Sequence, residues 1–131
     1  MVDRSARPHI VVCEEEPALC DVYQELFASE GYRVTVLSAP CDDLAEVVRL
    51  APDLLILDLL FAKRPSGSAF LQHLKTHPAT QALPVLVCTA ADRLADQAQQ
   101  QWDCPAVAKP FDLDELLLAV RHCLRTKAST A

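Results

Sequence analysis

The chain alternates short apolar runs with longer segments in which apolar residues recur every three or four positions. Continuous apolar runs of four to six residues are typical of strands buried on both faces, as in a parallel sheet covered by helices. The sequence predicts five such strands, over residues 9–13, 32–37, 53–57, 83–88 and 105–108.

The segments between the runs have helical periodicity and recognisable helix ends. Pro17 suits a first helical turn, Gly31 suits a helix end, and Asp112 with Glu115 forms a capping pair. The sequence therefore predicts helices beginning at Pro17 and at Asp112, with three more over 41–50, 67–77 and 92–101, the last of which has only a thin apolar stripe. Regular structure is expected to end near Arg125, before a frayed tail.

Strand–helix alternation repeated five times predicts an α/β fold, a doubly wound five-stranded parallel sheet flanked by five helices. The 131 residues suit a single domain, 1–131, with a core over about 9–125 and frayed termini. The longest apolar stretch is interrupted by Asp58 and the N-terminus lacks a signal-peptide core, so we expect a cytoplasmic protein that does not span a membrane. The net charge of −6 argues against nucleic acid as a partner of this domain.

Polar side chains follow four of the five predicted strands. They are Glu14 and Glu15, Asp58, Thr89, and Lys109. Because ligands of open parallel sheets bind beyond the carboxyl ends of the strands, we expect these side chains to meet at one edge.

The chemistry of this set favours a divalent cation and a phosphoryl group. Converging carboxylates without a nearby histidine suit Mg²⁺, a hard cation that prefers oxygen ligands. A lysine ammonium and a threonine hydroxyl beside the metal can each bind a phosphoryl oxygen. A carboxylate can also act as a nucleophile and form an acyl phosphate.

Four motifs, in this order, resemble the receiver domain of two-component response regulators: IVVCEEEP, PDLLILD, LPVLVCTAA and AKPFDLDEL. The resemblance covers about residues 9–125 and implies a flavodoxin-like fold with sheet order 2-1-3-4-5. It also implies that Asp58 accepts a phosphoryl group from a histidine kinase or phosphotransfer protein, with Mg²⁺ as cofactor.

The resemblance further assigns roles around Asp58. Glu15 would bind the metal directly and Glu14 through water, with the main-chain carbonyl of Leu60 as another ligand. Thr89 and Lys109 would hold the phosphoryl oxygens. The signal would then pass to the fourth helix, fifth strand and fifth helix, where a downstream protein binds. The implied protein is a switch, not an enzyme beyond its own phosphorylation and dephosphorylation, and a monomer or weak dimer.

The chain departs from the family pattern in three places. The acidic pair is Glu–Glu, the loop after Asp58 is one residue longer and carries Lys63 and Arg64, and Ala106 stands where the family often has an aromatic residue. Lys63 and Arg64 either belong to a solvated loop or lean toward the acidic site, and Trp102 is interpreted as a packing residue. These departures leave an alternative open, a degenerate receiver that binds proteins without being phosphorylated.

Two apolar residues, Leu60 and Ala91, occupy positions that tune hydrolysis in the family. Neither can orient an attacking water, so the resemblance implies a long-lived phosphoryl group.

Six cysteines are spread along the chain without a CxxC motif or a zinc-ligand spacing. We interpret them as small buried apolar residues in a reducing compartment. A redox role is the alternative, with Cys13 and Cys88 as the candidates.

Overall fold

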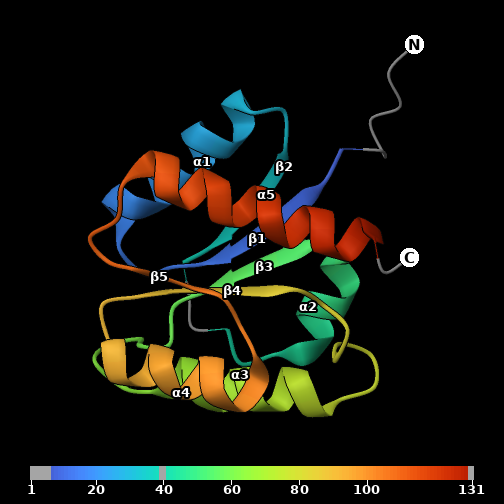
Figure 1. The fold of residues 1–131 in the computed structure, drawn as a ribbon, viewed down its shortest axis with the longest axis vertical. Helices are drawn as coiled ribbons and strands as arrows, with labels where there is room; N and C mark the ends of the chain where they lie inside the picture. The colour runs from blue at the N-terminus through green and yellow to red at the C-terminus, as the bar shows by residue number, and fades with distance from the viewer. Residues whose placement is uncertain (1–6, 39–40, 130–131) are drawn as a thin grey trace.

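A computed structural model of the protein describes residues 7–38 and 41–129. Its centre is a five-stranded parallel sheet with strand order β2-β1-β3-β4-β5 (Figure 1). The strands are β1 (His9–Cys13), β2 (Arg33–Leu37), β3 (Leu54–Leu57), β4 (Val85–Thr89) and β5 (Ala106–Ala108). The predicted fold class and sheet order are therefore confirmed.

Helices cover both faces of the sheet. They are α1 (Pro17–Ser29), α2 (Leu44–Leu50), α3 (Ser66–Thr76), α4 (Asp92–Trp102) and α5 (Leu113–Ser129). Figure 1 shows α1 and α5 on one face and α2, α3 and α4 on the other. Within the described ranges, no helix is both long and apolar enough to cross a bilayer.

The two-sided covering explains the continuous apolar runs in the sequence. Alternate strand side chains enter opposite layers: Val11 and Leu55 pack toward the α2, α3 and α4 side, whereas Ile10 and Ile56 pack toward α1 and α5. All four are fully buried. Burial of each such side chain stabilises the fold by about 1.5–3 kcal/mol, so neither face can carry polar residues without loss of stability.

Two helix boundaries differ from the prediction by more than one residue. Helix α2 begins at Leu44 instead of residue 41, because the side chain of Asp43 accepts the Ala45 backbone N–H at 3.0 Å and caps the first turn there. Helix α5 continues past Arg125 to Ser129, so that part of the predicted frayed tail is helical. The rest of the predicted frayed termini, residues 1–6 and 130–131, lies outside the described residues.

The interpretation of the cysteines is correct for some and wrong for others. Cys88, Cys104 and Cys123 are buried thiols, and Cys20 is a partly exposed thiol. Cys13 and Cys41, however, form a disulfide, with their Cα atoms 6.2 Å apart. The two residues are 28 positions apart in sequence, so no local pattern signals that the segment before α2 returns to the end of β1.

The start of α3 packs closely on the backbone that follows β3. Gly67 is buried, and its N–H donates to the Leu59 carbonyl at 3.1 Å. A Cβ on Gly67 would overlap the Asp58 carbonyl oxygen and would come within 2.6 Å of Leu59 Cα. Residue 67 must therefore be glycine for the loop after Asp58 to keep its path.

We expect Gly67→Ala to lower the free energy of unfolding by about 2 kcal/mol, within the range typical of overpacking, because the atoms in the way are rigid backbone. Urea denaturation measures the change. Ser68→Ala, one residue further along the same helix, should stay within about 0.5 kcal/mol of wild type. Equal stabilities for Gly67→Ala and wild type would show that the loop can move aside.

Candidate functional site

The site is organised around the ammonium group of Lys109, which follows β5. Lys109 Nζ donates to Asp58 Oδ2 at 2.7 Å and to Glu14 Oε1 at 2.5 Å. The two acceptors follow β3 and β1, so one side chain joins the ends of three strands. The side chain of Lys109 is 14% exposed, and both carboxylates are more deeply buried.

Asp58 directly follows the last residue of β3 and is 8% exposed. Its Oδ1 accepts the Leu60 backbone N–H at 3.0 Å, and its own N–H donates to the Cys13 carbonyl at 3.4 Å. One carboxylate oxygen is thus fixed by the backbone and the other by the lysine. This pairing explains how an acidic residue ends an otherwise apolar buried segment, since a buried carboxylate needs such partners.

The two glutamates after β1 lie in different environments. Glu14 is 2% exposed, and its Oε2 also accepts the backbone N–H of Glu16 at 3.2 Å. Glu15 is exposed, and both of its carboxylate oxygens accept the Ala62 backbone N–H at 3.0 Å. Only Glu14 therefore contacts Lys109 and belongs to the buried part of the site.

Thr89 ends β4 and is almost completely buried. Its Oγ1 accepts the Ala91 backbone N–H at 3.2 Å, and its carbonyl accepts the Lys109 backbone N–H at 3.0 Å. The second bond fixes the backbone of Lys109 beside β4. Thr89 therefore helps to set where the lysine side chain begins.

The electrostatics of the site favour a charged lysine. Burial disfavours the ammonium, but the hydrogen bonds that Lys109 donates to Asp58 and Glu14, together with the charges of these carboxylates, outweigh it, so the pKa of Lys109 is raised above its ordinary value. One ammonium between two carboxylates leaves one net negative charge. This charge can attract a further cation.

The candidate ligand atoms are of the kind that Mg²⁺ prefers, but in this structure they are bonded to other groups. Carboxylate and carbonyl oxygens are its preferred ligands, but Lys109 already bonds to Asp58 and Glu14, and Glu15 is turned to Ala62. Within residues 7–38 and 41–129, no group of three or more His, Cys, Asp or Glu side chains is placed to hold a metal ion. The Glu15 carboxylate accepts the Ala62 N–H and does not share the Lys109 ammonium with Glu14 and Asp58.

The loop after Asp58 contributes through its backbone, which the sequence did not indicate. Lys63 and Arg64 are exposed, and the loop is closed by backbone hydrogen bonds of 2.9 Å in both directions between Phe61 and Arg64. The loop group that bonds to the acidic pair is the Ala62 N–H, which donates to Glu15 alone. Ala62 and Lys63 have φ values of 50° and 62°, and nothing in their side chains signals this conformation.

Two neighbouring contacts also went unpredicted. The Cys20 thiol donates to the Glu14 carbonyl at 3.2 Å, and the Tyr23 hydroxyl donates to Cys88 Sγ at 3.1 Å, one residue before Thr89. Burial raises the pKa of Cys88 to about 11, so this thiol is neutral at pH 7. Trp102 is partly buried against the α2, α3 and α4 core, which confirms its interpretation as a packing residue.

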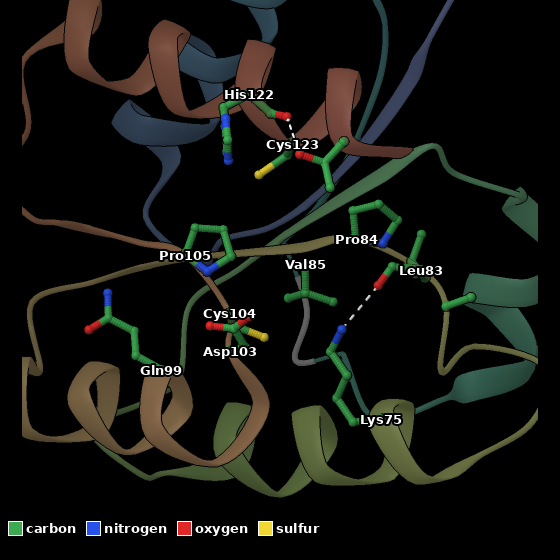
Figure 2. A pocket seen from close by; sticks show the side chains of 12 residues that line it. Lys75, Leu83, Pro84, Val85, Gln99, Asp103, Cys104, Pro105, His122 and Cys123 are labelled. Atoms are coloured by element: carbon green, nitrogen blue, oxygen red, sulfur yellow. Dashed lines mark hydrogen bonds between the residues drawn. The ribbon is translucent and has the colours of Figure 1, made fainter. Parts of the chain in front are cut away.

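A separate hollow of about 540 Å³ lies where β4 and β5 begin (Figure 2). His122 and Cys123 on α5 line it from one side, and Lys75 on α3 lies opposite with its ammonium on the Leu83 carbonyl at 3.3 Å. None of the five predicted site side chains lines it. Since it is at the opposite strand ends, it is not part of the acidic site.

Comparison with known proteins places the chain in one family. The family model for the response regulator receiver domain matches residues 10–121. The chain is 34% identical over 121 residues to the DNA-binding dual master transcriptional regulator RpaA of Synechocystis, covering 90% of this chain and 49% of that protein. It therefore spans about half the length of this curated relative.

Solved structures agree. A putative response regulator from Chloroflexus aurantiacus is 25% identical, has a TM-score of 0.79, and is matched over 91% of this chain and 98% of its own. The chemotaxis protein CheY4 of Vibrio cholerae has a TM-score of 0.76 at 17% identity, over 91% of this chain and 100% of its own, which shows the same fold.

We expect Lys109→Met to lower the free energy of unfolding by about 3 kcal/mol at pH 7, because two buried carboxylates lose their shared cation. Urea denaturation gives the value. Lys63→Met, which removes an exposed cation, should change it by less than about 0.5 kcal/mol. Adding Asp58→Asn to Lys109→Met should restore part of the loss, and a double variant no more stable than Lys109→Met would refute the shared-cation account.

Proposed function

Because this chain belongs to the response regulator receiver domain family of two-component signalling, we propose that Asp58 accepts a phosphoryl group from the phosphohistidine of a histidine kinase or phosphotransfer protein. The observation that carries the proposal is the contact of Lys109 with both Asp58 and Glu14. It joins the predicted phosphoacceptor to the predicted lysine and to one member of the acidic pair.

The transfer would centre on Asp58 and on the lysine bonded to it. An Asp58 carboxylate oxygen attacks phosphorus, the phosphorus–nitrogen bond breaks, and the bonding electron pair leaves with the imidazole. Asp58 Oδ1 accepts the Leu60 N–H, and Asp58 Oδ2 accepts a hydrogen bond from Lys109. If Lys109 changed partner, Oδ2 would be free to attack. The product is an acyl phosphate on Asp58.

Lys109 and Thr89 then bind the new phosphoryl oxygens. The Lys109 ammonium is next to Asp58, so a small movement exchanges a carboxylate oxygen for a more highly charged phosphoryl oxygen. The Thr89 hydroxyl, now an acceptor for Ala91 N–H, would donate its proton to another phosphoryl oxygen. Both new hydrogen bonds, from Lys109 and from Thr89, would favour the phosphorylated conformation over the unphosphorylated one.

Receiver domains generally bind Mg²⁺ at the phosphorylation site, where it supplies positive charge to the phosphoryl oxygens. Here we assign Glu14, Glu15, Asp58 and the main-chain carbonyl of Leu60 as its ligands. Glu15 would exchange Ala62 N–H for the cation, directly or through water. The cost of that exchange, and the extra χ angle of glutamate, predict weaker binding than an aspartate pair gives.

The signal would pass from Thr89 to the surface made by α4, β5 and α5. Ala106 replaces the aromatic residue of the family pattern, so the proposed route is movement of the loop after β4 and of α4. RpaA, a relative about twice as long, is described as DNA-binding. For this domain we propose a protein target, with this chain acting as a switch, not as an enzyme.

The alternative is a degenerate receiver that binds its partner without phosphorylation. The Glu–Glu pair and Ala106 favour it, and the Asp58–Lys109 contact opposes it. Chemical phosphorylation separates the two.

We expect acetyl phosphate with Mg²⁺ to add the mass of one phosphoryl group to wild type, and to add none to Asp58→Asn. Intact-mass spectrometry reads this directly. Glu15→Gln should raise the Mg²⁺ concentration needed for half-maximal phosphorylation at least severalfold, because a charged ligand is lost. Glu16→Gln, a neighbouring exposed carboxylate, is the matched control and should behave as wild type. Wild type that remains unmodified under these conditions would favour the degenerate receiver.

A second expectation concerns how long the phosphoryl group remains. Leu60 and Ala91 offer no side-chain donor or acceptor to orient a water on phosphorus, so we expect a lifetime of hours at pH 7. Leu60→Asn should shorten it several-fold, whereas Leu118→Asn, on an exposed part of α5, should not. The decay of the phosphorylated mass after removal of acetyl phosphate gives the rate, and a wild-type lifetime of seconds would contradict this expectation.

A further inference from the structure

The disulfide between Cys13 and Cys41 adjoins the acidic site. Cys13 is the last residue of β1, and Glu14 follows it directly. The Cys13 carbonyl accepts the Asp58 N–H at 3.4 Å, and the Glu14 N–H donates to the Leu37 carbonyl of β2 at 3.1 Å. The disulfide therefore links the residues directly before α2 to the strand end from which the site is built.

The two cysteines differ in exposure. Cys13 is 1% exposed, whereas Cys41 is partly exposed. A hollow of about 290 Å³ adjoins Cys41 and is lined by residues on both sides of it, including Leu37, Asp42 and Asp43. A small thiol can thus approach Cys41 Sγ and not Cys13 Sγ.

We propose that Cys13 and Cys41 are a reversible redox pair that fixes residues 41–43, directly before α2, against the acidic end of β1 when oxidised and releases them when reduced. The proposal goes beyond phosphorylation of Asp58 and does not require it. Cytosolic disulfides are typically transient and redox-sensing, so the cytoplasmic location predicted from the sequence suits a switch better than a permanent crosslink.

The chemistry is thiol–disulfide exchange with a small-molecule disulfide, RSSR. The Cys41 thiolate attacks RSSR, forming a Cys41–SR mixed disulfide and releasing one RS⁻. The Cys13 thiolate then attacks Cys41 Sγ and releases the second RS⁻. The two cysteines lose two protons and two electrons, and RSSR gains them to give two RSH. Reduction by RSH runs in reverse and begins at Cys41.

The charge of the hollow selects among small disulfides. The hollow is lined by three acidic residues, Asp42, Asp43 and Glu46. One guanidinium nitrogen of Arg49 lies 3.9 Å from a carboxylate oxygen of Glu46 and offsets part of this charge. The excess of negative charge should speed exchange with the cationic disulfide cystamine relative to the anionic oxidised glutathione. Added salt should reduce the difference, because it screens exposed charges.

The first test counts thiols in a Cys20→Ser background, since Cys20 is the partly exposed free thiol. Five of the six cysteines then remain. After denaturation and alkylation, intact mass should give five alkyl groups for reduced protein and three for protein treated with cystamine. Five alkyl groups after treatment, or loss of two in a Cys13→Ser, Cys41→Ser control, would overturn the assignment.

The second test uses single variants in the same background. Cys13→Ser should trap cysteamine on Cys41, whereas Cys41→Ser should remain unmodified over the same time because Cys13 is buried. Cys104→Ser, another buried position, is the matched control and should form the Cys13–Cys41 bond as the background does. Equal modification of both single variants would refute attack at Cys41.

The third test asks whether the pair acts on the acidic end of β1. Amide hydrogen exchange by NMR should show the Glu14 N–H exchanging at least severalfold faster in reduced than in oxidised protein, because Cys13, the residue before Glu14, is no longer bonded to Cys41. The Val87 N–H, in the sheet centre, should be unchanged. Equal Glu14 rates would overturn the proposed coupling. Neither result depends on phosphorylation, so the two proposals fail separately.

Discussion

The Lys109 ammonium between Asp58 and Glu14 is the interaction on which the site depends. It is the contact that makes two buried carboxylates at the ends of β3 and β1 compatible with a folded protein. The same contact prepares the site for a phosphoryl group, because a cation that two carboxylates share can exchange one of them for a stronger anion at little cost. Stability and the proposed function therefore rest on the same bonds. A substitution that removes these bonds is expected to change both.

The backbone around Asp58 constrains the site as firmly as the charges do. Leu60 N–H fixes one oxygen of Asp58, and the close approach of Gly67 fixes the path of residues 58 and 59. The loop in turn presents Ala62 N–H to Glu15. The position of Glu15 is thus decided by a loop whose turn is made by residues with positive φ, and metal binding would compete with that backbone contact.

The sequence was sufficient for the sheet and for the buried half of the site. Continuous apolar runs such as 53–57 require burial on both faces, and this requirement determines the layers and puts Asp58, Thr89 and Lys109 at the carboxyl edge of the sheet. The strand order that makes their strand ends neighbours was implied by the resemblance to receiver domains. What the sequence could not supply depends on backbone geometry and on contacts distant in the chain. Glu14 and Glu15 are adjacent and chemically equal, and only the path of the loop after Asp58 separates a buried ion pair from an exposed side chain. Cys41 likewise bonds to Cys13 across 28 positions of sequence, a pairing with no local signature.

These two unpredicted features meet at the end of β1, where residue 13 carries the disulfide and residues 14 and 15 carry the acids. A strand end held by β2 on one side and β3 on the other leaves its last side chains little freedom, and the acidic pair lies where that restraint ends. Any bond that tightens the β2 side restrains the backbone of Glu14, while Lys109 restrains its side chain. The disulfide at Cys13 thus restrains the backbone next to Glu14, and the ion pair with Lys109 restrains the Glu14 side chain. Since glutamate has more freedom than aspartate, a chain that uses Glu–Glu here gains more from such restraint than one with an aspartate pair.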